Sequence, residues 1–92
     1  MFEWDENKSQ RNMIDRGFDF TEIYKFDWET AKIKQDDRKD YGEDRYWAFG
    51  FCNSKMTAVT FTPRGKKIRI ISMRRMHRKE GVTHGIFKEI IR

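Results

Sequence analysis

The stretch RYWAFGFCNSKMTAVTFTPRGKKIRIISM, residues 45–73, decides the fold class, because its apolar residues recur with the period of two that is typical of strands. Two segments rich in turn-forming residues, Asn53-Ser54-Lys55 and Thr62-Pro63-Arg64-Gly65, interrupt this alternation. Strands joined by such short connections pair with their neighbours in an antiparallel meander. The three expected strands span residues 45–52, 56–62 and 66–73.

A helix is expected before this meander. Asp5 is a suitable N-cap, and Gly17 is a suitable C-terminal stop directly after Arg16. The segment between them contains few apolar residues. We therefore expect this helix to lie on the surface and to bury one stripe that includes Met13 and Ile14.

A second helix start follows at once. Asp19 and Glu22 form a capping pattern, which predicts a helix that ends near Asp27. Residues 35–44 are almost entirely charged and predict a loop whose acidic side chains are solvated. A third helix is expected to start after Ser72 and to continue through the C-terminal segment.

These elements predict one α+β domain over residues 1–92. Two N-terminal helices would pack on a three- to four-stranded antiparallel sheet, and a C-terminal helix would follow. Phe2–Trp4 is expected to supply the fourth strand, at an edge of the sheet.

The composition excludes several classes of protein. Aromatic residues make up 15% of the chain, too many for a disordered protein. No apolar run approaches the roughly 18 residues of a membrane span, and the N-terminus lacks the pattern of a signal peptide. The lone Cys52 excludes a disulfide framework and fits a reducing compartment. We therefore expect a soluble, cytoplasmic protein.

The net charge of +5 is distributed unevenly along the chain. Residues 1–44 contain eight Lys and Arg against thirteen Asp and Glu, whereas residues 45–92 contain twelve against two. Eight basic residues without an intervening acid are Arg64, Lys66, Lys67, Arg69, Arg74, Arg75, Arg78 and Lys79. This run indicates a surface for a polyanion, most often nucleic acid. An acidic protein segment and a merely solvated face are the alternative interpretations.

The sequence points to chemistry that uses no metal and no cofactor. It contains neither the Cys and His spacing of zinc sites nor a Gly-rich phosphate loop. RNA can be cut without a metal when the neighbouring 2′-OH attacks the phosphorus and side chains move the protons. Arginine suits the phosphate, because its charged planar group binds two phosphate oxygens at once. The proton carriers near the basic run are His77, Glu80 and His84.

Four motifs carry a resemblance to a known family. They are Phe2-Glu3-Trp4-Asp5 with Lys8 behind it, Arg16-Gly17-Phe18-x-Phe20-x-Glu22, Tyr41-Gly42-Glu43-Asp44-Arg45, and Arg64-Gly65-x-x-Ile68-Arg69-Ile70-Ile71-Ser72-x-Arg74-Arg75 with Arg78 and Glu80 behind it. In their order and spacing over residues 2–84, they resemble BrnT-type toxins of bacterial type II toxin–antitoxin systems. Arg16 stands where that family commonly has His, and His84 stands near the place of a common Tyr.

The resemblance implies a fold similar to that of RelE- and ParE-type toxins, and a growth-inhibiting ribonuclease that needs no metal. It also implies a co-expressed BrnA-type antitoxin with a ribbon-helix-helix DNA-binding part. We expect the two proteins to form a hetero-oligomer with 2:2 stoichiometry. RNA would be the substrate, and DNA would be contacted only through the antitoxin.

The resemblance also guides the expected site. Arg69, Arg74, Arg75 and Glu80 match the family's shared pattern. We expect Arg69 and Arg74 to clamp the scissile phosphate, and Glu80 or His84 to move protons. The expected RNA-binding residues are Arg64, Lys66, Lys67, Arg75, Arg78 and Lys79.

Two other kinds of function remain open at this point. One is a nucleic-acid or protein-binding module without catalysis, such as a ParE-like inhibitor of a DNA-handling enzyme. The other is a decayed toxin that still binds its antitoxin but has lost its activity.

Overall fold

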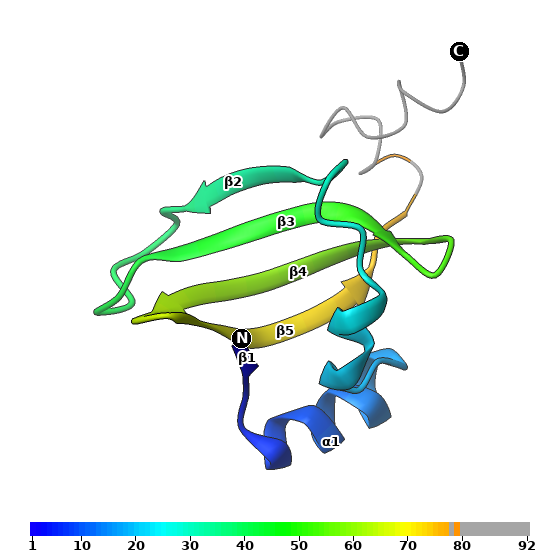
Figure 1. Ribbon diagram of the computed structural model, residues 1–92, viewed down its shortest axis with the longest axis horizontal. Coiled ribbons are helices and arrows are strands. Elements are labelled where there is room, and N and C mark those ends of the chain that lie inside the picture. Colours follow the sequence, from blue (N-terminus) through cyan, green and yellow to red (C-terminus); the bar gives the residue numbers. More distant parts are fainter. Residues whose placement is uncertain (78, 80–92) are drawn as a thin grey trace.

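The computed structural model describes residues 1–77 and 79. Five strands in this part of the chain form one sheet with the order β1-β5-β4-β3-β2 (Figure 1). The strands are β1 (Phe2–Glu3), β2 (Lys32–Asp36), β3 (Arg45–Cys52), β4 (Lys55–Arg64) and β5 (Lys67–Arg75). β3, β4 and β5 form the expected meander at its centre. β2 pairs antiparallel with β3 at one edge, and β1 pairs parallel with β5 at the other.

The expected fold, with two N-terminal helices on a three- to four-stranded antiparallel sheet, is therefore wrong. Within residues 1–77 the sheet is mixed and is accompanied by one α-helix, α1 (Glu6–Arg16), and one short 3₁₀ helix, η1 (Phe20–Lys25). None of the helices in the described part of the chain has the length and hydropathy that a membrane span requires.

The segment after Asp19 forms the 3₁₀ helix η1 instead of the expected longer helix, because the chain joins the sheet soon afterwards. Asp19 caps η1 by accepting a hydrogen bond from the Thr21 N–H at 2.9 Å. Phe26 then forms a bridge with Cys52, and the Asp27 N–H donates to the Phe51 carbonyl at 2.8 Å. A six-residue segment held at both ends has no room for a longer α-helix.

β2 is a strand that sequence patterns do not predict. Its residues are exposed except for Asp36, and Ile33 is 54% exposed, so no apolar face marks it. Pairing with the edge of β3 supplies the backbone hydrogen bonds that the side chains do not specify. The exposed Lys32 and Lys34 are typical of edge strands, which must avoid further pairing.

β5 continues to Arg75, beyond Ser72, where the sequence predicted the start of a helix. The ten-residue β4 offers pairing partners along this whole length, and Arg75 pairs with Thr57. The prediction of a helix start at Ser72 is therefore wrong. The rest of the expected C-terminal helix lies outside the described residues.

α1 has the predicted ends but not the predicted buried stripe. Asp5 accepts hydrogen bonds from the N–H groups of Asn7 and Lys8, and Gly17 adopts the left-handed conformation with φ 82°. Met13 and Ile14, however, are 51% and 80% exposed.

Two polar residues, Ser9 and Asn12, are buried instead and attach α1 to its neighbours. The Asn12 side chain donates to the Met73 carbonyl at 2.9 Å and accepts from the Met73 N–H at 3.4 Å. Ser9 Oγ accepts a hydrogen bond from the Phe20 N–H at 2.8 Å. Asn12 thus replaces a neighbouring strand along this part of β5, where β1 no longer pairs with it.

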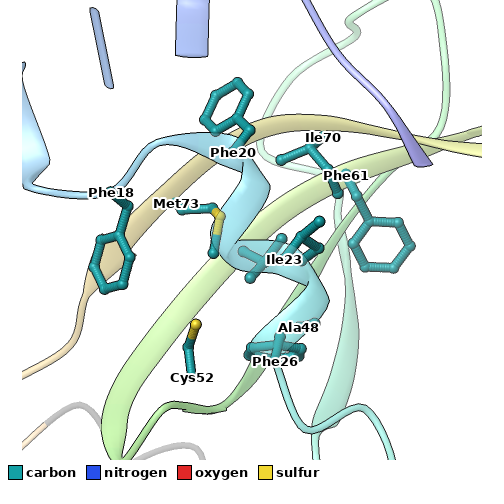
Figure 2. Close-up of a cluster of buried hydrophobic side chains, with 10 residues drawn as sticks. Phe18, Phe20, Ile23, Phe26, Ala48, Cys52, Phe61, Ile70 and Met73 are labelled. Atoms are coloured by element: carbon teal, nitrogen blue, oxygen red, sulfur yellow. The ribbon is translucent and has the colours of Figure 1, made fainter. Parts of the chain in front are cut away.

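The two faces of the sheet carry separate buried clusters. We call the face that packs against η1 the covered face; its cluster contains Phe18, Phe20, Ile23, Phe26, Ala48, Cys52, Val59, Phe61, Ile70 and Met73 (Figure 2). On the other side, which we call the opposite face, Phe49, Ala58 and Met76 are buried, with Trp47, Phe51 and Met56 packed against them. The two clusters fix the direction of every side chain on the central strands.

Candidate nucleic-acid interface

Arg69 and Arg74 lie on the same face of the sheet. Residues that are directly paired across antiparallel strands point their side chains to the same side. Arg69 pairs with Thr62, and Arg74 pairs with Ala58, which belongs to the buried cluster of the opposite face. Since Thr62 and Ala58 are four residues apart on β4, both arginines point to the opposite face.

A β-bulge produces this arrangement. In a regular strand, residues five positions apart point to opposite faces, so Arg69 and Arg74 would be separated. The pairing shifts between Thr60 and Phe61, and Ile71 becomes an extra residue on β5. Because of this bulge, the side chains of Arg69 and Arg74 extend from the same face of the sheet.

The neighbouring Arg75 lies on the covered face. It pairs with Thr57, which in turn pairs with Gly50. A Cβ atom at Gly50 would meet the Phe26 ring at 3.0 Å, which places that position under the covered-face cluster. Arg75 is exposed, but its side chain starts on the other side of the sheet from Arg74.

The remaining described cations of the expected site lie at the end of the β4–β5 hairpin and beyond β5. Arg64 and Lys67 pair with each other on the opposite face, and Lys66 lies in the turn between them. Lys79, beyond β5, is exposed. We use the term basic row for the cations of β4 and β5 that point to the opposite face: Arg64, Lys67, Arg69 and Arg74.

The basic row is extended rather than convergent. Four residues separate the β4 partners of Arg69 and Arg74, which corresponds to roughly 13 Å along the strand. The two arginines are therefore spaced along the direction of the strand, and such a linear array matches successive phosphates of a polyanion.

Two arginines of the basic row are held by acidic residues. Arg69 Nη1 lies 3.1 Å from Glu3 Oε2, and each of the two side chains is 29% exposed. Arg64 Nη2 lies 3.2 Å from Glu43 Oε1, and Arg45 binds the other oxygen of the same carboxylate at 3.2 Å. Burial raises the pKa of Glu43, but the hydrogen bonds from Arg45 and Arg64 outweigh it, so the pKa is lowered overall.

Three residues of the expected site, Arg78, Glu80 and His84, lie outside the described residues. The expected proton carriers Glu80 and His84 are therefore not placed. His77, the other histidine near the basic run, is exposed and lies two residues after the end of β5.

An ion pair anchors the loop beside the opposite face, although the sequence predicted solvated acids there. Asp36 is only 3% exposed and accepts hydrogen bonds from Arg38 Nε at 2.8 Å and Nη2 at 2.9 Å. The hydrogen bond from Arg38 is the main reason that the pKa of Asp36 falls from 3.8 to about 2. The guanidinium of Arg38 also lies 4.5 Å from the centre of the Trp47 ring, which fixes the loop against the opposite face.

Sequence reasoning missed a second basic region, a groove between α1 and the bulge of β5. It has a volume of about 240 Å³, and the described residues that line it are Lys8, Arg11, Asn12, Asp15, Arg16 and Ile71. We call it the α1 groove. Cations and polar residues at positions 8, 11, 12, 15 and 16 share one side of a helix, and this spacing was the available signal in the sequence.

The comparison with protein-family models gives a match. The family model described as "Ribonuclease toxin, BrnT, of type II toxin-antitoxin system" matches residues 4–80. A search of curated proteins found no match. The matched segment contains α1, η1 and the strands β2 to β5, with both the basic row and the α1 groove. Because it makes up most of the chain, the chain belongs to the BrnT family, the ribonuclease toxins of type II toxin–antitoxin systems.

Proposed function

We propose that this ribonuclease toxin cuts RNA internally without a metal ion, by attack of a 2′-OH on the adjacent phosphorus. The observation that carries the proposal is the placement of Arg69 and Arg74 on one face of the sheet, which the bulge at Ile71 produces. Guanidinium groups stabilise the negative charge that develops on phosphate oxygens during such an attack.

The reaction balances without an external reagent. The 2′ oxygen forms a bond to phosphorus as it loses its proton to a base, and the bond from phosphorus to the 5′ oxygen breaks. The leaving 5′ oxygen takes up a proton from an acid. The products are a 2′,3′-cyclic phosphate and a 5′-hydroxyl end, and we propose Glu80 and His84 as the residues that move the protons.

The basic row supplies different phosphate contacts along its length. We propose that Arg69 and Arg74 contact the scissile phosphate and its neighbour, and that Arg64, Lys66 and Lys67 contact phosphates toward the hairpin. Arg78 and Lys79 would extend the same surface beyond β5. Arg75, on the covered face, fits a contact to a strand that passes the edge of the sheet.

Membership of a type II toxin–antitoxin family implies an antitoxin partner. We propose that this partner is a BrnA-type protein with a ribbon-helix-helix domain, that the complex is 2:2, and that it acts in the cytoplasm. The partner's DNA-binding part would carry any contact with DNA. What supports a partner that covers the basic surface is the excess of cations over acids in residues 45–92.

The test of the catalytic proposal is an RNA gel with purified, antitoxin-free protein in the presence of EDTA. We expect cleavage, 2′,3′-cyclic phosphate ends, and full resistance of a substrate that carries 2′-deoxyribose at the cut site. Arg69→Ala should reduce the rate at least tenfold. Cleavage that stops in EDTA would contradict the metal-free mechanism, and RNA that is bound but never cut would indicate a binding module.

The test of the partner proposal is thermal unfolding of the free toxin and of its complex. A partner that binds only the folded toxin raises the unfolding temperature by mass action. We expect a higher temperature for the complex. Equal temperatures would contradict coverage of the basic surface.

A further inference from the structure

The α1 groove is built rather than accidental. The amide of Asn12 in its lining is fixed by hydrogen bonds to both backbone groups of Met73 and to the Phe18 carbonyl. Ile71, the extra residue of the bulge, lines the groove from the β5 side. Bulges commonly redirect a side chain next to a functional site. One wall of the groove is therefore the helix α1, and the other is the strand β5. The hydrogen bonds between the Asn12 side chain and the Met73 backbone hold the two walls together.

The charge of the groove is unbalanced. Among its described lining residues, Lys8, Arg11 and Arg16 bring three positive charges, and Asp15 brings one negative charge. Within the part of the chain that the structure describes, none of these three cations takes part in an ion pair. A phosphate in the groove would gain their attraction without displacing a carboxylate.

The lining favours an ionic ligand over an amphipathic peptide. Five of the six described lining residues are polar or charged, and Ile71 is the apolar exception. The exposed apolar residues of α1, Met13 and Ile14, do not line the groove. A volume of about 240 Å³ also lies below the roughly 300–1,000 Å³ of pockets that enclose drug-sized ligands. A phosphate with part of its sugar is a ligand of the right chemistry and a suitable size.

The groove lies beside the basic row. Ile71 lies between Arg69 and Arg74 on β5, and its neighbour Ser72 pairs with Thr60 on the opposite face. A strand of RNA that leaves the opposite face between the two arginines therefore crosses the edge of β5 at the bulge. α1 lies beside β5 (Figure 1), so the α1 groove between them is the next surface that the strand meets.

We propose that the α1 groove binds a backbone phosphate of the RNA, one or two nucleotides from the phosphate held by the basic row. Lys8 and Arg11 contact the phosphate oxygens, Arg16 closes one end of the groove, and Asp15 limits the affinity. This inference rests on the proposed function, because it assigns a second contact to the same RNA strand.

The test measures binding of a non-cleavable probe. A fluorescein-labelled 12-nucleotide single-stranded RNA with 2′-O-methyl groups cannot undergo attack by its 2′ oxygens. Its affinity is measured by fluorescence anisotropy between 50 and 200 mM KCl for the wild type and for Lys8→Gln/Arg11→Gln. The matched control is Lys25→Gln/Lys39→Gln, which removes the same charge from η1 and from the β2–β3 loop. Circular dichroism confirms that each variant is folded.

We expect the groove variant to bind at least tenfold more weakly than the control. We also expect its slope of log K against log salt to be smaller by about 1.4, the value for two lost contacts to a single strand. Asp15→Asn should change affinity in the opposite direction, with a gain of two- to fivefold. This second variant also removes a charge from the groove. Because its expected effect is a gain in affinity, unfolding of the variant cannot produce it.

Three results would overturn the inference. A groove variant that binds the probe as the control does, while the wild type still cuts RNA, removes the groove and leaves the proposed function intact. A groove variant that keeps its RNA affinity but loses affinity for the antitoxin assigns the groove to an acidic protein segment. A wild-type protein that neither binds the probe nor cuts RNA refutes both proposals.

Discussion

The basic row and the α1 groove are two positively charged regions that differ in whether their cations form ion pairs with acidic residues. In the row, Arg64 and Arg69 are neutralised by Glu43 and Glu3, which come from the acidic part of the sequence. In the groove, the described residues leave three cations against a single acid. Paired cations stabilise the fold but must exchange partners to bind a phosphate. Unpaired cations repel one another in the free protein and are ready to bind.

This difference also explains the uneven charge of the sequence. The acidic excess of residues 1–44 is used in part to hold the basic strands, as Glu3 does for Arg69 on β5. α1, although it lies in the acidic half, carries three cations, Lys8, Arg11 and Arg16, that form no ion pair within the described part of the chain. Charge counted along the sequence therefore does not locate the surface that is most available to an anion.

Asn12→Ala tests the contact between α1, which lines the groove, and β5, which carries part of the basic row. It removes the side chain that binds the Met73 and Phe18 backbone and leaves buried polar groups unsatisfied. We expect the free energy of unfolding to fall by about 2–3 kcal/mol, as measured by urea denaturation. Gln10→Ala, an exposed amide on the same helix, is the control and should change it by less than about 0.5 kcal/mol. Equal effects of the two substitutions would show that α1 does not depend on this contact.

Arg74→Ala and Arg75→Ala compare the two faces of the sheet with adjacent residues of the same type. Because Arg74 lies on the face of the basic row, we expect its loss to reduce RNA cleavage at least tenfold. Arg75→Ala should reduce cleavage by less than threefold. Initial rates on one RNA substrate provide the measurement. A larger loss at Arg75 would place the catalytic surface on the covered face.

Glu3→Gln converts a paired cation of the row into an unpaired one. Without the carboxylate at 3.1 Å, Arg69 no longer exchanges partners when a phosphate binds. We expect two- to fourfold tighter binding of the 2′-O-methyl RNA, and a small loss of thermal stability. Glu6→Gln, an exposed acid in the first turn of α1, serves as the control for the change in net charge. Unchanged affinity would mean that the Glu3 pair does not limit the row.

Asp36→Asn tests the ion pair between Asp36 and Arg38 beside the opposite face. The folded-state pKa of Asp36 is about 2, below the ordinary 3.8, so the ionised carboxylate stabilises the fold above pH 3.8. This stabilisation is lost as the pH falls through 2. We expect the wild type to be more stable than Asp36→Asn at pH 7, with a difference that shrinks toward pH 2 in urea unfolding. Asp37→Asn, at the exposed neighbouring position, should show no comparable pH-dependent difference.

The meander and both ends of α1 were predictable because each depends on local signals. Alternating apolar residues mark β3 and β4, and Asp5 and Gly17 act within one turn of the helix that they bound. The capping role of Asp19 was predictable for the same reason, although the helix type was not.

The missed features depend on contacts between distant residues. β2 is a strand because β3 offers an edge, and Ser9 and Asn12 are buried because η1 and β5 offer backbone groups. The bulge at Ile71 has no sequence signature, yet it decides that Arg69 and Arg74 share a face. The residue types of the candidate site were thus visible in the sequence, whereas their grouping depends on the register between β4 and β5.

The parallel pairing of β1 with β5 has a consequence for the order of assembly. The Ile68 N–H donates to the Met1 carbonyl at 2.8 Å, so the first residues of the chain complete the edge of a strand that is synthesised 66 positions after Phe2. A ribosome releases the partners in that order, and contacts across such long separations form late. Until β5 has left the exit tunnel, Glu3 has no arginine and Asn12 has no strand to bind. The edge of the sheet at which β1, α1 and β5 meet therefore cannot form before residues 67–75 are available, however early α1 itself folds.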